Sequence, residues 1–266
     1  MEIPPREGSS SPRCFDDLPA EVQAVCNSLL DRLETILDDT LYGIYLYGAV
    51  VFPETRYIHD IDLHVIVKRP LTIYQSEEIR HLHKLLANEF PQVVGDGLDA
   101  WYILMDDAQK VSSPRHQVYP DKADGSWALH RAHMRAGYCI VLYGPKPEEI
   151  FPAPAWSELV QALEVERGFI EELLSKHPDY CVLNLCRLLY SYRMKDVVVS
   201  KRASAVWAFY HLANWAHLIE AALRVYERKG NEEDRRLLQT GVEDFYQFVC
   251  DRIDESNRGI DNKSMQ

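Results

Sequence analysis

The segment from Leu41 to Lys68 constrains the fold of this chain more than any other part of it. It opens with an apolar run, LYGIYLY, that ends at Gly48-Ala49, and after a short polar stretch it continues as DIDLHVIV from Asp60. Both runs have the length and the aromatic and β-branched content of strands. Because alternate side chains of a strand share a face, Asp60 and Asp62 would lie together, opposite the apolar residues between and after them. We therefore expect two strands, the second opening with a pair of carboxylates.

Paired carboxylates at the start of a buried strand suit a divalent metal. Mg²⁺ prefers oxygen ligands and commonly completes its shell with a substrate phosphate, and a glycine such as Gly48 allows a backbone or phosphate to approach closely. A third carboxylate is expected on an adjacent strand, and Asp99, in the predicted strand 98–105, is the candidate. Two plainer interpretations stay open: Asp60 and Asp62 could simply solubilise an exposed strand face, and Asp99 could be a turn residue following the 95–97 turn.

Composition limits the classes of partner. The 266 residues are enough for two domains. The formal charge of −12 argues against general binding of nucleic acid, which depends on clustered Lys and Arg, and is compatible with a cationic small substrate. The six cysteines have no C-x-x-C spacing, and the Pro- and Ser-rich N-terminus resembles neither a signal peptide nor a membrane anchor. We expect a cytoplasmic protein with reduced cysteines and no membrane partner; the oligomeric state stays open.

The order of patterns along the chain predicts an α+β fold with two domains. Residues 1–14 are rich in Pro, Ser and Gly and are expected to be disordered. Residues 15–150 combine amphipathic helices with apolar strands, predicting a mixed β-sheet with flanking helices, with a loop over 106–126 and a helix over 127–137. Residues 151–256 predict a helical bundle, including one continuous helix over 203–226 and another over 237–253. Residues 257–266 are expected to be a polar tail.

The strand, the Gly48-Ala49 turn and the Asp60-x-Asp62 pair together resemble the nucleotidyltransferase superfamily signature, a Gly-Ser turn followed by Asp-x-Asp on the next strand. From about residue 41 to 253 the chain is similar to one branch, the streptomycin/spectinomycin adenylyltransferases among the aminoglycoside nucleotidyltransferases. The segments that carry this narrower resemblance are VLYGP followed by EEIF at 141–151, CVLNLCRLLY at 181–190 and SKRASAVWA at 200–208.

The resemblance implies a nucleotidyltransferase fold, ATP as co-substrate and Mg²⁺ held by Asp60 and Asp62, with Asp99 at the position of the family's catalytic base. It implies that Gly48 and Ala49 lie at the nucleotide phosphates, that Arg187 and Lys201 reach the triphosphate, and that Tyr226 lies near the nucleotide. It also places the active site between the two domains. Independently of the family, a charge at Arg187 inside so apolar a helix would be costly to bury without a partner; the plainer alternative is that Arg187 and Lys201 are ordinary surface cations.

The chain also departs from the family pattern. Ala49 stands where the family has a serine that helps to hold phosphates, and Asp99 is shorter than the family's catalytic glutamate. The acidic residues that grip streptomycin are replaced around His177 and Pro178. The leading hypothesis is transfer of AMP from ATP to a hydroxyl of a small cationic, aminoglycoside-like acceptor, which would make the protein an antibiotic-resistance enzyme. The alternatives are a nucleotidyltransferase acting on another metabolite or a protein, and a nucleotide-binding protein with weakened catalysis.

Overall fold

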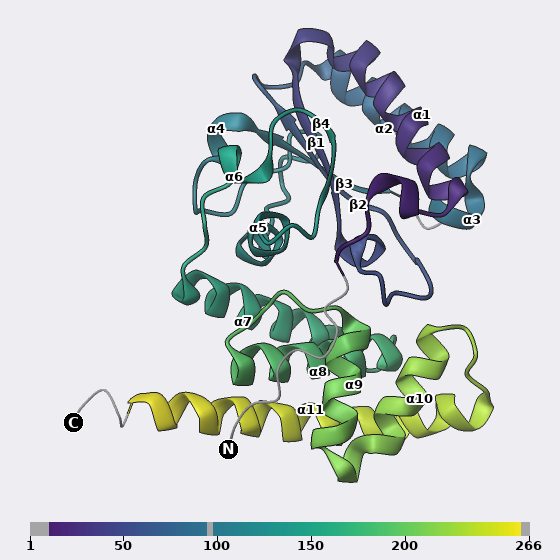
Figure 1. The fold of residues 1–266 in the computed structure, drawn as a ribbon, viewed down its shortest axis with the longest axis vertical. Coiled ribbons are helices and arrows are strands. Elements are labelled where there is room, and N and C mark those ends of the chain that lie inside the picture. The colour runs from purple at the N-terminus through teal and green to yellow at the C-terminus, as the bar shows by residue number, and fades with distance from the viewer. Residues whose placement is uncertain (1–10, 95–97, 262–266) are drawn as a thin grey trace. The chain divides into compact units, whose positions relative to one another are not determined.

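The structure of the protein is a computed structural model, and it describes residues 11–94 and 98–261 (Figure 1). The chain divides into two compact units: the first comprises residues 11–123 and 133–152 of the described chain, and the second residues 124–132 and 153–261. The main elements of the first unit are α1 (Ala20–Leu37), β1 (Leu41–Tyr47), η3 (Gly48–Val51), β2 (Asp62–Val67), α2 (Ile73–Glu89), α3 (Pro91–Val94), β3 (Asp99–Leu104), α4 (Met105–Ala108), β4 (Ile140–Tyr143) and α6 (Pro147–Ile150).

The first unit is built on a four-stranded mixed sheet with the order β3-β2-β1-β4. β1 pairs antiparallel with both β2 and β4, while β2 and β3 run parallel. The predicted mixed sheet with flanking helices is therefore confirmed. In Figure 1, α1 and α2 lie side by side along one face of this sheet. α2 begins at a capping box, in which the Thr72 hydroxyl accepts a hydrogen bond from the backbone N–H of Gln75.

The two faces of the sheet are covered differently. One face joins the main core of the unit, in which Leu63, Val65 and Tyr102 pack with apolar residues of α1 and α2. The opposite face carries ring contacts, such as the edge-on packing of Tyr45 against Phe151 with centroids 5.1 Å apart. Since side chains alternate along a strand, the residues between the core positions belong to this second face, and among them are the predicted site residues.

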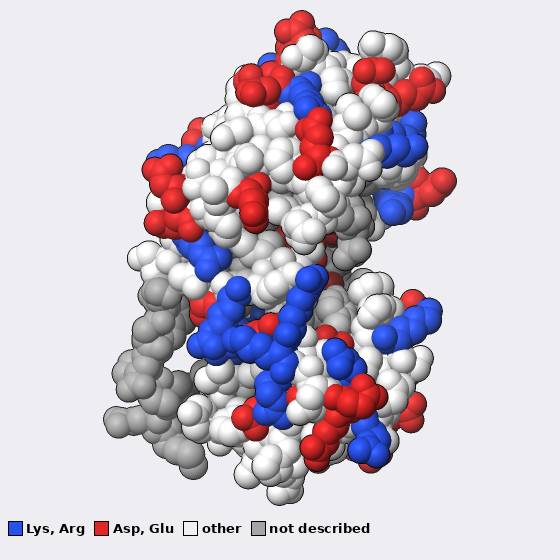
Figure 2. Space-filling view, turned by 90° about the vertical axis from the view of Figure 1, so that its right-hand side faces the viewer, with Lys and Arg blue, Asp and Glu red and all other residues white. Residues whose placement is uncertain are grey.

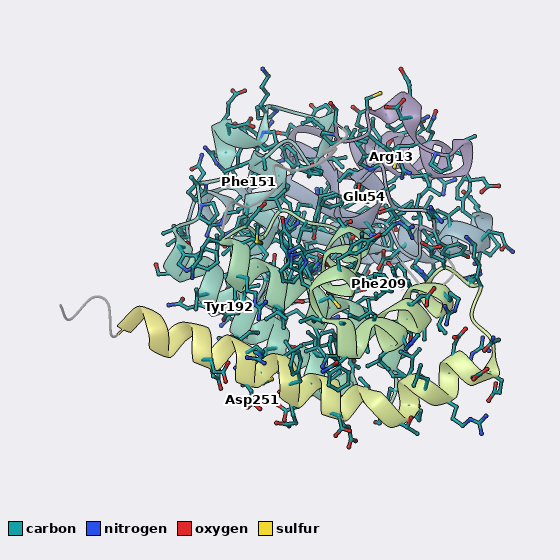
Figure 3. All side chains as sticks on the ribbon, turned by 60° about the horizontal axis from the view of Figure 1, so that its bottom comes forward. Arg13, Glu54, Phe151, Tyr192, Phe209 and Asp251 are labelled. Carbon is teal, nitrogen blue, oxygen red and sulfur yellow. The ribbon has the colours of Figure 1, made fainter. Side chains whose placement is uncertain are left out.

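The second unit is a helical bundle with its own buried core. Its elements are most of α5 (Trp127–Arg135), then α7 (Trp156–Leu173), α8 (Pro178–Met194), α9 (Lys201–His211), η4 (Ala213–Trp215), α10 (Ala216–Tyr226) and α11 (Glu232–Asp261). The central helix α8 is buried along much of its length and contacts α7, α9, α10 and α11. Figure 3 labels Tyr192 on α8 and Asp251 on the neighbouring α11.

Several boundaries differ from those predicted. β2 begins at Asp62 rather than Asp60. The predicted continuous helix over 203–226 is wrong: the chain leaves helical geometry at Leu212, so that α9 and α10 are separate helices. The last helix extends to Asp261, past the predicted end of the bundle at residue 256. The predicted loop over 106–126 contains the end of α4 and an antiparallel bridge between Arg115 and Ala123.

The chain termini fall largely outside the described residues. Three predictions fall wholly or partly on residues that the structure does not describe. They are the disorder of residues 1–14, of which 1–10 are not described, the turn at 95–97, and the polar tail, of which 262–266 are not described. Where the description begins, the chain is held in place, because the Arg13 guanidinium donates hydrogen bonds to the carbonyl oxygens of Val50 and Thr55 at 3.0 and 2.9 Å.

The surface and the helix lengths bear on possible partners. On the face drawn in Figure 2, basic and acidic side chains are interspersed in the upper part of the view, and several basic side chains gather in its lower part. Within residues 11–94 and 98–261, no helix combines the length and the apolar character that crossing a membrane requires.

Candidate active site

The end of β1 and the start of β2 meet at Gly48 and Asp62. Asp62 is the Cα partner of Tyr47, the last residue of β1. Gly48 follows with a φ of +77°, and a Cβ atom added there would collide with the Asp62 carboxylate. A side chain at residue 48 would therefore suffer both backbone strain and a direct clash. The glycine brings the backbone of η3 against a carboxylate, as the sequence predicts for a phosphate- or metal-binding turn.

Asp62 and Asp99 stand side by side. They are Cα partners in the parallel pairing of β2 with β3, in which neighbouring strands lie about 4.8 Å apart. The backbone N–H of Asp99 donates to the carbonyl of Ile61 at 3.2 Å, which fixes this register. Asp99 is the first residue of β3, and its side chain is exposed, whereas Asp62 is half-buried. The pairing brings two predicted ligands together from strands that are 37 residues apart in sequence.

Asp60 lies in the connection that precedes β2. It is exposed, while the next residue, Ile61, is fully buried in the core of the first unit. Asp60 precedes Asp62 by two residues, so it lies in the segment that leads into the start of β2. An oxygen-only set of carboxylates, partly open to solvent and next to a Cβ-free backbone turn, fits the ligand preference of Mg²⁺.

Buried histidine and tyrosine side chains lie on β1 and β2 and next to β3, close in sequence or in the sheet to Asp62 and Asp99. Two residues after Asp62, His64 is fully buried and its ring stacks on Tyr47 with centroids 4.6 Å apart. His116 lies under β3: its Nε2 is 3.1 Å from the Ala100 carbonyl, and its Nδ1 accepts the backbone N–H of Val118 at 3.0 Å. These contacts require a neutral ring protonated at Nε2, and burial lowers the pKa of His116 to about 4. No sequence pattern singled out His116, because it lies in the predicted loop over 106–126.

In the second unit, the candidate phosphate-binding lysine lies between two tyrosines. Lys201 is the first residue of α9, which Ser200 caps by accepting the N–H of Ala203 at 3.0 Å. The Lys201 ammonium is 4.6 Å from the ring centroid of Tyr180 and 5.5 Å from that of Tyr226. Both distances are those of cation–π contacts. The structure thus brings Lys201 and Tyr226 together, and it adds Tyr180, which the sequence interpretation had not singled out.

The candidate arginine lies on the same face of α8 as Tyr180. Arg187 follows Tyr180 by seven residues, close to two helical turns. Its side chain is 27% exposed and its Nη2 atom is 3.6 Å from Oε2 of Glu166 on α7. The flanking Cys186 and Leu188 are buried in the bundle core. A half-buried guanidinium with an acidic partner agrees with the expectation that a charge on this apolar helix needs compensation.

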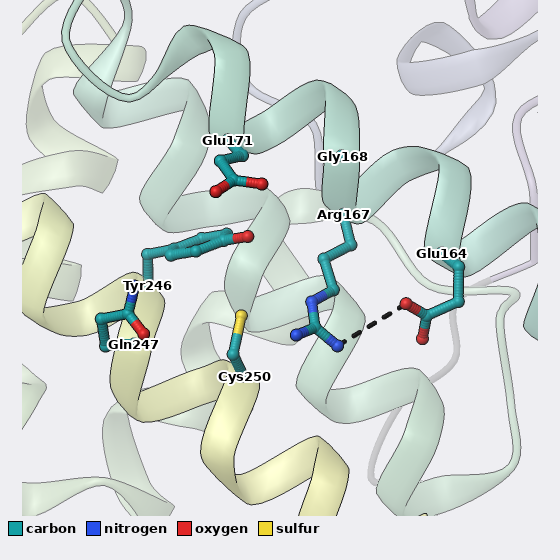
Figure 4. A pocket seen from close by; sticks show the side chains of 7 residues that line it. All are labelled: Glu164, Arg167, Gly168, Glu171, Tyr246, Gln247 and Cys250. Carbon is teal, nitrogen blue, oxygen red and sulfur yellow. Dashed lines mark ion pairs between the residues drawn. The ribbon is translucent and has the colours of Figure 1, made fainter.

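A separate groove in the second unit contains none of these residues. It has a volume of about 410 Å³, lies between α7 and α11, and is crossed by the ion pair between Arg167 and Glu164 (Figure 4). Its lining consists of Glu164, Arg167, Gly168, Glu171, Tyr246, Gln247 and Cys250. Arg167 is also paired with Asp254 at 3.1 Å, so the positive charge in this groove is already compensated within the bundle.

Comparison with known proteins assigns the helical part of the chain. Residues 149–252 match the family model described as the aminoglycoside adenylyltransferase C-terminal domain. The helical part of the chain is therefore similar to the C-terminal domain of the aminoglycoside adenylyltransferases. The matched residues include Arg187, Lys201 and Tyr226, and the assignment confirms the resemblance to this nucleotidyltransferase enzyme family.

The fold of nearly the whole chain has a solved counterpart. The crystal structure of the spectinomycin adenyltransferase AAD(9) from Enterococcus faecialis, determined with ATP and spectinomycin, covers 87% of this chain and 98% of its own. The TM-score is 0.69 and the sequence identity is 16%, so the likeness is one of fold. The predicted combination of a nucleotidyltransferase fold with a C-terminal helical bundle is confirmed. No curated protein sequence gives a significant match to the chain.

Proposed function

We propose that this adenylyltransferase-family protein transfers AMP from ATP to a hydroxyl group of a small cationic acceptor of the aminoglycoside type, in a Mg²⁺-dependent reaction. The observation that carries the proposal is the register of β2 and β3. It sets Asp62 beside Asp99 where the backbone at Gly48 lies against the Asp62 carboxylate. Carboxylates next to a close backbone turn are what a metal-bound phosphate requires.

The acidic residues divide between binding and proton transfer. Asp60 and Asp62 would hold Mg²⁺, and Asp99 would either complete the ligand set or accept the proton of the acceptor hydroxyl. Mg²⁺ held there would stabilise charge on the attacking hydroxyl oxygen and on the pyrophosphate that leaves when AMP is transferred. Asp99 can serve as a base only for a hydroxyl within about 2.6–3.2 Å, or through one water, and its shorter side chain reaches less far than a glutamate.

The second unit supplies the complementary charge. Arg187 and Lys201 would bind the phosphates of ATP, since fixed cations stabilise charge on a transferring phosphoryl group. The Tyr180 and Tyr226 rings hold Lys201 without neutralising it, because a cation–π contact leaves the ammonium charge in place.

The acceptor class rests on the family and on charge. The solved structure with the same fold is described with ATP and spectinomycin, and the family of the helical domain is named for aminoglycosides. The net charge of −12 favours a cationic acceptor over a polyanionic one. ATP and Mg²⁺ are both supplied by the cytoplasm, which we propose as the site of the reaction, with antibiotic resistance as its outcome.

One observation favours a second candidate function, binding of ATP without efficient transfer. Residue 49 follows the close turn at Gly48 and, as alanine, offers no hydroxyl to phosphate, and Asp99 is one methylene shorter than a glutamate. Mass spectrometry of purified protein with ATP, Mg²⁺ and a panel that includes spectinomycin and streptomycin separates the two. We expect one acceptor to gain a single adenylyl group with the native protein and none with Asp62→Asn. ATP binding without modification of any acceptor would favour the second candidate.

A further inference from the structure

The acidic partner of Arg187 is itself held by a chain of polar contacts within the second unit. Glu166 is 16% exposed, and its two oxygens have different partners. Oε2 faces the Arg187 guanidinium at 3.6 Å, while Oε1 accepts a hydrogen bond from the Ser126 hydroxyl. A carboxylate with both oxygens engaged in different directions cannot rotate freely, so the position of its negative charge relative to Arg187 is fixed.

The segment that carries Ser126 is anchored on both sides. The backbone N–H of Ser126 donates to Oδ1 of Asp124 at 3.0 Å, and Oδ2 of Asp124 is 2.8 Å from Nδ1 of His130. Asp124 is 3% exposed. A Cβ atom at Gly125 would come within 2.9 Å of the Val165 side chain, next to Glu166 on α7. Only a glycine fits here without displacing Val165. The tight turn at 124–126 therefore lies against α7, where the Ser126 hydroxyl reaches Glu166.

We propose that Glu166 is a positioning residue for Arg187, and that the 124–126 turn fixes Glu166 through the Ser126 hydroxyl. This inference rests on the proposed function, in which Arg187 binds the triphosphate. The 3.6 Å separation is an ion pair longer than a hydrogen bond. Glu166 therefore orients the guanidinium by charge and leaves its N–H donors available for phosphate oxygens.

The sign of the effect distinguishes positioning from direct binding. A negative charge near a triphosphate opposes ATP binding, so Glu166 lowers ATP affinity while it holds Arg187 in one orientation. Loss of Glu166 should then leave ATP binding unchanged or stronger, and should slow the transfer step, for which a misplaced group can cost up to about 100-fold. A residue with a merely structural role would weaken both together.

The first experiment measures kcat and KM for ATP in Glu166→Gln and Ser126→Ala. We expect kcat to fall about tenfold in Glu166→Gln and about threefold in Ser126→Ala, with KM for ATP unchanged or lower in both. Ser126→Thr keeps the hydroxyl group, and the kcat of this variant should equal that of the native protein. The exposed Glu172→Gln, on the same helix, is the matched control and should leave both constants unchanged. A rise in KM with unchanged kcat in Glu166→Gln would overturn the proposal.

The second experiment needs no transfer activity. Calorimetry of Mg-ATP binding is combined with a double-mutant cycle over Arg187→Ala and Glu166→Gln. In the Arg187→Ala background Glu166 becomes an uncompensated negative charge, so Glu166→Gln should tighten ATP binding about tenfold there and little in the native background. Additive effects would disprove the coupling between the two residues. Native protein that binds no ATP at all would instead disprove the proposed function, and the two failures are thus distinguishable.

Discussion

The two units position their candidate site residues by different means. In the first unit, the backbone register of parallel strands places Asp62 beside Asp99, because the two residues are Cα partners. In the second unit, Arg187 and Lys201 are placed by side chains, through Glu166 in one case and two tyrosines in the other. A sheet thus fixes the position of the Cα atom, while long cationic side chains on helices need further contacts to fix their charged ends. The carboxylates should therefore respond to substitution mainly in chemistry, and the cations also in geometry.

The largest effect is expected at the metal-binding pair. Asp60→Asn and Asp62→Asn should each abolish measurable transfer and weaken Mg²⁺-dependent ATP binding, since each removes a charge from a site built around a cation. The thermal midpoint should hold or rise, because repulsion between carboxylates is relieved. Transfer assays, calorimetry and thermal unfolding test this, with Asp31→Asn on the exposed surface of α1 as the control. Native-level transfer in either variant would refute the metal assignment.

A smaller loss is expected at Asp99. Asp99→Asn should retain most Mg-ATP binding but transfer at a rate reduced about 100-fold or more, the usual scale for loss of a general base. Asp99→Glu should retain or increase transfer, because the longer side chain extends the reach of the carboxylate. Single-turnover rates at saturating ATP measure both variants. If Asp99→Asn transfers at the native rate, Asp99 is neither a base nor an essential ligand, and the register of β2 and β3 has no catalytic role.

In the second unit, Arg187→Ala and Lys201→Ala should each weaken ATP binding or slow transfer. Loss of a charged hydrogen bond to phosphate costs about 1.5–3 kcal/mol, or about 10- to 150-fold. Lys201→Arg tests the geometric side of the comparison, because its larger planar head should fit poorly between Tyr180 and Tyr226 despite its equal charge. Calorimetry with ATP provides the readout, and the exposed Arg236→Ala is the control. Native affinity in both alanine variants would limit the site to the first unit.

The smallest effect concerns stability at low pH. Burial lowers the pKa of His83 and of His116, both in the first unit, to about 4, whereas an unfolded histidine has a pKa near 6.5. Below about pH 6.5 the unfolded state binds more protons, so the first unit should lose stability as pH falls toward 4. We expect a loss of about 1–2 kcal/mol between pH 7 and pH 5 after allowance for partial solvation.

Urea unfolding combined with hydrogen exchange of β3 and α8 locates this loss. Exchange protection should fall first in β3, and the non-titrating variant His83→Gln should show a weaker pH dependence. Equal loss of protection in β3 and α8 would mean that the two units do not differ in this respect.

Local sequence patterns indicate the acidic candidate residues more directly than the basic ones. Alternating apolar residues identify β1 and β2, and the D-x-D pair marks their open end, because both signals are local. Tyr180 and Glu166 were missed, since their roles depend on contacts with residues 21 or more positions away.

The break between α9 and α10 was missed for a related reason. Leu212 leaves helical geometry without a glycine or proline nearby, so the tertiary packing of the bundle, rather than local propensity, determines where α9 ends.

The excursion of residues 124–132 into the second unit has a consequence for modularity. The polypeptide passes from one unit to the other three times, after Ala123, after Ala132 and after Pro152. Arg131, fully buried and paired at 2.6 Å with Glu158, belongs to the second unit but precedes the last part of the first. No single cut in the gene can therefore separate the two units intact. A recombination event at residue 152 would leave Arg131 without Glu158, which favours inheritance of the two units as one block over exchange of either one alone.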